Sequence, residues 1–417
     1  NCTSLSIGNN AFNGCRDLTS VNLSGCTSIG NYAFYYCSYI ASSADLSKCT
    51  SIGDSAFNNC YRITGSVDLS SCTSIGNSAF NGCKNITGVT WPIDSVQEIP
   101  EACFNGCTNL KGFNGTENFD LTKITSIGNQ AFNGCSSITG SVDLSSCTTI
   151  GESAFNGCST DLKPTISTNT TNIGKNAFPS ISSYLTIVAE NEDELINYCS
   201  GIATDSGNLQ GLSDVKKVAD IPGVTDTPSG LSYNTSDIAK DASATYYLIA
   251  SSKDDYIVPS YQTEVAYDVA LKSVANGASD ATAVAGDIPL TIQIPAEQYD
   301  QNKIYFFSVG DTIISSRVTP TETFSFTRSV NLPAGTSTVA LLSTEVLVVD
   351  DFFVEPTEGG VNIIGFNIPE GQTAAITVPD KINNQKVVSL DNHGNRLIGV
   401  DQVTSLDTSN CTSLSIG

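Results

Sequence analysis

The chain has 417 residues, more than one compact core usually holds, so several domains or an elongated repeat array are expected. Its 42 Asp and Glu outnumber its 19 Lys and Arg, and the net charge of −23 argues against binding to nucleic acid or to anionic membrane surfaces. No apolar run reaches about 18 residues, so no membrane insertion is expected in this segment. The lack of any methionine indicates a processed or excised segment.

The first part of the chain, up to about residue 185, is an internal repeat. Its phenylalanines recur in A-F or C-F pairs, 22 to 28 residues apart, at Phe12, Phe34, Phe57, Phe80, Phe104, Phe132, Phe155 and Phe178. Val67 and Leu69 alternate as in a short strand, whereas Ala56 to Cys60 has the closer spacing of a helical turn. One unit cannot fold alone, so we expect stacked units that share a core: a mainly β solenoid with short helical turns.

Each unit follows a pattern close to C-T-S-I-G-x-x-A-F-x-x-C-x-x-I/L. This pattern resembles the BspA-like class of bacterial cell-surface leucine-rich repeats. The resemblance implies a leucine-rich repeat solenoid, an extracellular location at the cell surface, and a role in adhesion. The fifth unit departs from the pattern at Pro100 and Cys103, and the eighth has no cysteine after Phe178, as expected where an array ends.

The cysteines of the array fall into two series, each with one member per unit. The first follows the A-F pair and comprises Cys15, Cys37, Cys60, Cys83, Cys107, Cys135 and Cys158; the second precedes I-G and comprises Cys2, Cys26, Cys49, Cys72 and Cys147. We predict that both series are buried thiols that pack as small apolar core residues, like the phenylalanines. Disulfides between neighbouring units remain an alternative, and a metal site is disfavoured because the array has no CxxC pair and no histidine.

An acidic segment from Glu190 to Cys199 follows the repeats and predicts a helix that caps the solenoid domain, residues 1–200. Its acids lack the alternating Asp/Asn pattern and the glycine of a calcium loop, so a solvated cap face is the preferred interpretation.

Residues 214–345 change to a period of two, typical of strands separated by Gly, Pro, Asp and Asn turns. This pattern predicts an immunoglobulin-like β-sandwich that serves as a spacer. The predicted strands are Tyr246 to Ala250, Glu264 to Ser273, Leu290 to Ile294, Lys303 to Val309, Phe324 to Val330 and Ser337 to Leu342.

Residues 349–417 resemble the N-terminal capping hairpin of BspA-like arrays together with the first rung of a further array. Strands are expected at Val361 to Phe366 and Ala375 to Pro379, and a short turn with a following strand is expected at Ile382 to Val387.

The octapeptide NCTSLSIG occurs twice, at Asn1 to Gly8 and at Asn410 to Gly417, 409 residues apart. A tandem array of 409-residue units, head-to-tail stacking of copies, and a circular permutation all explain it. Two rungs of a longer, non-identical array would explain it as well. The expected self-association junction comprises Asn1, Cys2, Leu5, Ile7, Cys411, Leu414 and Ile416.

No catalytic, cofactor-binding or metal-binding residues are predicted. His393, the only histidine, lies in a D-N-H-G-N turn, and no G-x-S-x-G, H-E-x-x-H, P-loop or dinucleotide motif is present. We therefore expect a non-enzymatic extracellular protein that forms a stalk or filament from 409-residue units, with further copies of itself as partners. The alternatives are a single-copy adhesin that binds a host protein or glycan through the solenoid face, and an accessory protein of an enzyme encoded elsewhere.

Overall fold

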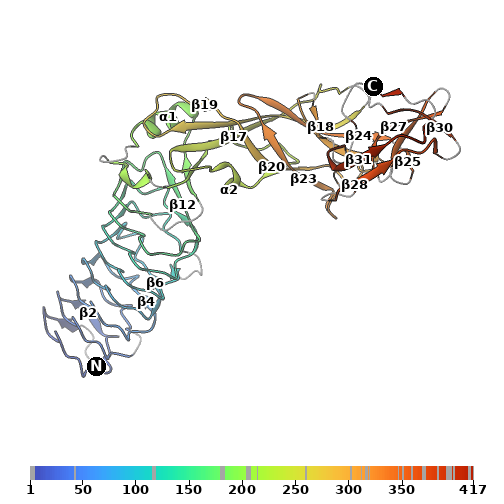
Figure 1. Cartoon of the computed structure of the whole chain (residues 1–417). Helices are drawn as coiled ribbons and strands as arrows, with labels where there is room; N and C mark the ends of the chain where they lie inside the picture. The colour runs from blue at the N-terminus through green and yellow to red at the C-terminus, as the bar shows by residue number, and fades with distance from the viewer. Residues whose placement is uncertain are drawn as a thin grey trace. The chain divides into compact units, whose positions relative to one another are not determined.

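The computed structural model describes residues 5–41, 44–114, 119–178, 184–202, 208–213, 215–258, 261–300, 303–310, 312–314, 318, 320–345, 347–349, 352–357, 360–368, 372–382, 385–390, 397, 400–411 and 415–416. The fold is mainly β and divides into two compact units (Figure 1). The first consists of Asn1–Gly223, Ala239–Tyr247 and Ser273–Thr282; the second consists of Val224–Ile238, Leu248–Lys272 and Ala283–Gly417.

The I-G segments of the repeats form short parallel strands, one per repeat. One sheet contains β1 (Leu5–Ile7), β2 (Cys26–Ile29), β3 (Ser51–Ile52) and β5 (Ser74–Ile75). The other contains β7 (Glu98–Ile99), β9 (Ser126–Ile127), β11 (Thr149–Ile150) and β13 (Asn172–Ile173). Equivalent isoleucines pair from one repeat to the next, as Ile29 does with Ile52 and Ile52 with Ile75, so the repeats stack in register.

A second set of parallel strands follows the leucine or valine positions of the repeats. It comprises β4 (Gly65–Asp68), β6 (Ile86–Thr90) and β8 (Gly112–Phe113), then β10 (Gly140–Asp143), β12 (Leu162–Ser167), β14 (Leu185–Val188) and β15 (Lys217–Asp220). Lys217 and Val218 of β15 pair in turn with Thr245 and Tyr246 of β17 (Ala244–Ser252). The parallel ladder thus continues past residue 200 and takes in a strand that does not belong to the repeat.

The A-F-x-x-C segments are successive turns instead of the helical turns expected from the sequence. In the third repeat, Ala56 N donates to Gly53 O and Cys60 N to Phe57 O, at 3.3 and 3.1 Å. Ser55 and Asn59 have positive φ angles of 54° and 61°, which are incompatible with a right-handed helix. Each left-handed residue turns the chain, so the segment wraps around the core without forming a helix.

The array ends at α1 (Glu192–Ser200), which confirms the helix predicted there. Its N-cap, Asn191, accepts a hydrogen bond from the Glu194 backbone N–H, and three acidic residues lie in the first turn, where the helix dipole favours them. The Tyr198 hydroxyl donates to Thr170 O at 2.7 Å and ties the helix to the last repeats.

A short 3-10 helix, η1 (Gln210–Leu212), completes this end of the array. A Cβ at Gly211 would lie 2.3 Å from Gly174 O, so only glycine lets η1 close on the repeat. Nearby, the fully buried Lys217 donates through Nζ to the carbonyls of Leu212, Val215 and Ala242 at 2.8–2.9 Å.

The second unit contains two antiparallel arrangements, and every strand predicted from the period of two overlaps an observed one. The first is β16 (Leu231–Tyr233), β20 (Gly286–Gln293) and β23 (Ser325–Leu332); the second orders β18 (Gln262–Ala275), β24 (Ser337–Glu345), β21 (Lys303–Val309) and β22 (Thr312–Ile313). The remaining elements of this region are α2 (Thr235–Ile238) and β19 (Thr282–Ala283). Strands β17 and β18 each contribute residues to both units.

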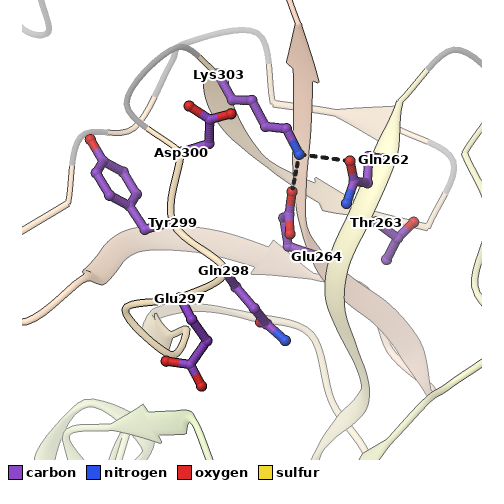
Figure 2. A pocket seen from close by; sticks show the side chains of 8 residues that line it. All are labelled: Gln262, Thr263, Glu264, Glu297, Gln298, Tyr299, Asp300 and Lys303. Atoms are coloured by element: carbon purple, nitrogen blue, oxygen red, sulfur yellow. Dashed lines mark hydrogen bonds and ion pairs between the residues drawn. The ribbon is translucent and has the colours of Figure 1, made fainter.

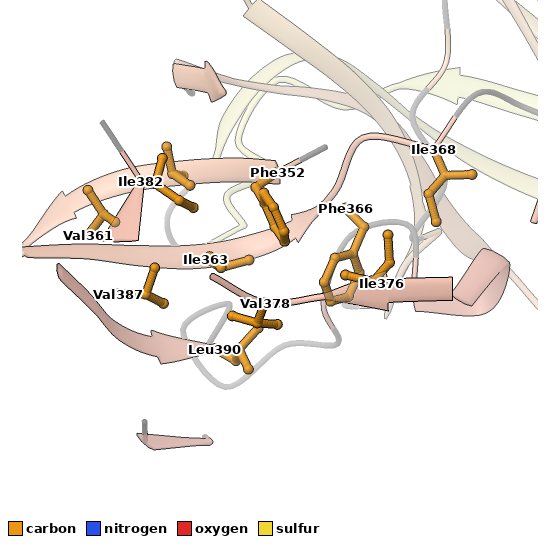
Figure 3. Packing of buried hydrophobic residues seen from close by; sticks show 11 residues of the cluster. Phe352, Val361, Ile363, Phe366, Ile368, Ile376, Val378, Ile382, Val387 and Leu390 are labelled. Carbon is orange, nitrogen blue, oxygen red and sulfur yellow. The ribbon is translucent and has the colours of Figure 1, made fainter. Parts of the chain in front are cut away.

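The last part of the second unit is β25 (Leu347–Val349), β26 (Phe352–Thr357), β27 (Gly360–Phe366), β28 (Ala374–Thr377), β29 (Lys381–Ile382), β30 (Gln385–Leu390), η2 (Val400–Gln402), β31 (Val403–Asp407) and β32 (Ser415–Ile416). The first two expected strands overlap β27 and β28. The third expected segment falls on β29 and β30, which pair antiparallel. Apolar side chains of this region form one buried cluster, shown in Figure 3.

Candidate functional site

The phenylalanines form a ladder through the centre of the repeats. Consecutive rings stack with centroids 5.2–5.8 Å apart, from Phe12 on Phe34 to Phe155 on Phe178. The rings from Phe34 onward are buried, whereas Phe12 is 39% exposed because its ring is stacked on one side only.

The thiols that follow these phenylalanines connect the repeats by hydrogen bonds. Six of them donate to the carbonyl of the phenylalanine in the preceding repeat, for example Cys60 Sγ to Phe34 O and Cys83 Sγ to Phe57 O, both at 3.1 Å. The others are Cys37, Cys107, Cys135 and Cys158, at 2.9–3.3 Å. Cys15, in the first repeat, is exposed.

Burial keeps these thiols protonated. It raises the pKa of Cys83 to about 12 and is the main cause of the same shift at Cys158. Burial also raises the pKa of Cys107 and Cys135 well above the ordinary range. A protonated thiol can donate a hydrogen bond but is a poor nucleophile and metal ligand, which suits a structural role.

The second cysteine series is also buried at the positions that the structure describes, namely Cys26, Cys49, Cys72 and Cys147; Cys2 lies outside them. Cys72 Sγ donates to Cys49 O and Cys147 Sγ to Ile124 O, both at 3.0 Å. The cysteines within the described ranges are free thiols, and no group of three or more His, Cys, Asp or Glu there could hold a metal ion.

The residues around each I-G pair set how closely two repeats approach. The carboxamide oxygen of Asn9 accepts from Asn31 N at 2.8 Å, and that of Asn31 accepts from Asp54 N at 2.9 Å. A Cβ on Gly30 would lie 2.6 Å from Asn9 N, and the later I-G glycines are equally crowded. Gly8 has nothing within 4 Å, so the first repeat presents a stacking surface of this kind that is uncovered in the structure.

The predicted junction residues of the first repeat are divided between exposed and buried positions. Leu5 is 37% exposed at the edge of β1, whereas Ile7 is 8% exposed. Asn1 and Cys2 lie outside the described residues.

At the other end of the chain, two strand pairs are parallel, as the strand pairs of the repeats are. Strand β31 pairs with β28, and β32 pairs with β30 through Leu390 and Ile416. The Cys411 thiol lies 3.6 Å from the Val378 and Pro379 carbonyls and is partly buried against the cluster of Figure 3. Leu414 lies outside the described residues, as does His393.

A polar cavity of about 880 Å³ lies in the second unit between β18, the 297–300 turn and β21 (Figure 2). Lys303 Nζ donates to Gln262 Oε1 at 2.7 Å and lies 3.3 Å from Glu264 Oε1. The side chains of this ion pair are only 13% and 5% exposed. Tyr299 points away from the pair and stacks on Tyr305. Glu297 and Asp300 also line the cavity, which is therefore predominantly acidic.

A family model described as a BspA type leucine rich repeat region matches residues 2–111 and 113–218, with 6 copies, and covers just over half of the chain. The chain belongs to the BspA-type leucine-rich repeat family. No curated protein and no solved structure matches the chain significantly.

In these BspA-type repeats the sequence identified the buried positions from the second repeat onward. The predicted burial of Phe12 and Cys15 is wrong, because no earlier repeat covers them in the structure. The hydrogen bonds of the thiols were not predicted. The constant spacing of three residues from phenylalanine to cysteine in seven of the eight repeats could have indicated them, because a residue that only fills apolar space does not have to be cysteine each time. Within the described part of the chain, no helix is long and apolar enough to cross a membrane.

Proposed function

We propose that this chain is a non-enzymatic extracellular structural protein, in which 409-residue units join end to end as a stalk or filament. In each 409-residue period a BspA-type solenoid, residues 1–200, is followed by an immunoglobulin-like spacer, residues 214–345. Residues 349–417 provide the cap and first rung of the next solenoid. Further copies of the unit, joined covalently or stacked head to tail, are the partners.

Family membership supports the location and the class of function. BspA-type repeat proteins are typically associated with the bacterial cell surface, are often involved in adhesion, and are typically non-enzymatic. The antiparallel strand groups β16, β20, β23 and β18, β24, β21, β22 support the immunoglobulin-like spacer, because such domains are built from antiparallel strands. The second group belongs to the ten-stranded sheet that also contains the parallel strands β14, β15 and β17.

The observation that carries the end-to-end proposal is the repeated octapeptide together with the space around Gly8. Strand β32 carries the same Ser-Ile pair as β1, and its partner β30 extends the ladder on one side. The preceding repeat crowds the I-G glycine at Gly30, Gly53, Gly76, Gly128, Gly151 and Gly174, whereas Gly8 has no atom of another repeat within 4 Å. Residues 349–417 of a neighbouring copy, which form the proposed cap and first rung, would supply a neighbour for Gly8.

Hydrogen exchange on a chain of two joined units, residues 1–409 followed by 1–417, tests this proposal. We expect the amides of Leu5 to Ile7 in the second copy of the sequence to exchange more slowly than in the single chain, because a strand of the first copy covers them. Gly8→Val in the second copy should abolish this protection from exchange. Asn10→Ser in the second copy introduces the residue found at the same position of later repeats, as Ser55 and Ser78, and should preserve the protection. Equal exchange in the joined and single chains would contradict the proposal.

A further inference from the structure

The second repeat departs from the others at its exposed turns. An Asn-Gly pair follows the phenylalanine in five repeats, at Asn13, Asn81, Asn105, Asn133 and Asn156. In the second repeat this pair is replaced by Tyr35 and Tyr36, and Tyr32 and Tyr39 flank them. These four residues and Tyr61 of the third repeat are called the tyrosine cluster below.

Two residues of the tyrosine cluster adopt a conformation that suits glycine or asparagine better. Tyr36 has a φ of 58°, at the position where Gly14, Gly82, Gly106, Gly134 and Gly157 have φ angles of 72–74°. Tyr32 has a φ of 57°, but this conformation is common to the repeats, since Ser55 and Ala102 have φ angles of 54° and 50° at the same position. A bulky residue is strained in this region, and such strain is typically retained where it serves a function.

The rings pack against one another on the surface of the repeats. Tyr35 meets Tyr36 edge to face with centroids 4.7 Å apart, and Tyr32 meets Tyr35 in the same way at 5.5 Å. Burial, and then the neighbouring phenols of Tyr36 and Tyr35, raise the pKa of Tyr61. Tyr32 and Tyr39 remain 42% and 48% exposed, so core packing does not account for them.

Three cations lie over these rings. Arg62 Cζ is 4.6 Å from the centroid of Tyr39, Lys84 Nζ is 5.3 Å from that of Tyr61, and Arg16 Cζ is 5.9 Å from that of Tyr36. Arg16 and Arg62 are the only arginines before residue 317 in a chain with a net charge of −23. None of the three cations forms an ion pair within the ranges that the structure describes.

We propose that the tyrosine cluster and its three cations bind an acidic segment of a partner protein. The cations and neighbouring rings cover several of the ring faces on which a sugar would stack, so the surface offers mainly ring edges, phenol hydroxyls and guanidinium N–H groups. Guanidinium groups pair with carboxylates through two parallel hydrogen bonds, and Tyr and Arg are the residues most enriched in protein interfaces. This site does not depend on how the units join.

Consensus-restoring substitutions test the site without risk to folding. Tyr35→Asn combined with Tyr36→Gly restores the pair that five other repeats carry, and Asn59→Gly makes the matching change in the third repeat without removing a tyrosine. The probe is a fluorescein-labelled peptide of alternating glutamate and leucine, titrated with the full chain and followed by fluorescence anisotropy. We expect salt-sensitive binding, a loss of about tenfold or more in affinity in the tyrosine variant, and no change in the control.

The same variant also separates a binding role from a structural one. Because it relieves strain, its thermal midpoint should be equal to or higher than that of the parent chain. A lower midpoint would show that the tyrosines stabilise the fold, and unchanged affinity would show that they do not bind the peptide. Failure of the peptide to bind the parent chain would overturn the proposal, and so would binding of polygalacturonate in its place, which would assign the surface to an acidic polysaccharide.

Discussion

Cysteine recurs three residues after the phenylalanine in seven of the eight repeats because its thiol both packs and donates a hydrogen bond. A thiol is small enough for the core, yet it donates to a carbonyl of the preceding repeat, as Cys83 does to Phe57. Alanine would fill part of the space without donating. The thiols therefore contribute to the register of stacking as well as to the core.

Cys83→Ala should lower the free energy of unfolding by about 1–2 kcal/mol, because it removes a buried hydrogen bond and leaves a small cavity. Cys15→Ala is the matched control, since Cys15 is exposed and should give no measurable change. Chemical denaturation of both variants measures the difference. Equal effects would show that the hydrogen bond contributes nothing.

Raised thiol pKa values make stability depend on pH in the alkaline range. Burial is the main cause that raises the pKa of Cys83, Cys147 and Cys158 from 9.0 to about 12. Below pH 9.0 each thiol is protonated in both states, so its contribution is fully present. Between pH 9.0 and about 12 the unfolded chain loses protons first, and stability falls by up to about 1.4 kcal/mol per pH unit for each thiol.

Denaturant titrations at pH 8 and in the alkaline range should show this fall in the parent chain. In Cys83→Ala the fall should be shallower, because one titrating group is missing. A parallel decline in both proteins would mean that other groups dominate.

At the scale of the repeating element, close approach of the backbones controls stacking. A Cβ on Gly53 would lie 2.5 Å from Asn31 N, and the neighbouring peptide cannot move without breaking the parallel strand pair. Gly8 occupies the same position in the first repeat with open space around it.

Gly53→Val should therefore destabilise the chain by about 3 kcal/mol, at the upper end of overpacking effects. Gly8→Val should leave a single chain unchanged. The thermal midpoints of the two variants test this difference. An equal loss of stability in both would mean that valine acts through the turn itself and not through stacking.

The sequence predicted much of each element but not its backbone detail. The spacing of the phenylalanines located the repeats, and the period of two located strands such as Lys303–Val309, which is β21 without change. The expected helical turns are wrong, because residues such as Ser55 and Asn59 take left-handed angles that neither side chain demands. The strain at Tyr36 was not predictable from the spacing either, since it depends on the turn geometry that the other repeats reveal.

In the whole molecule, the end-to-end proposal depends on the exposed surfaces of the first repeat and of the last strands. The first repeat has an exposed Phe12 and an open Gly8, and the last strands, β31 and β32, pair in parallel with β28 and β30. Leu406 of β31 is 44% exposed, as an apolar residue at an uncovered ladder edge would be. If the end of one copy stacked on the first repeat of the next, apolar surface would be buried on both copies.

Electron microscopy of the negatively stained chain at high protein concentration tests the end-to-end claim most directly. We expect fibres with a constant axial repeat, set by one complete 409-residue period. These fibres should be lost in Gly8→Val while the variant stays folded. Isolated particles without end-to-end contacts in the parent chain, or fibres that persist in Gly8→Val, would contradict it.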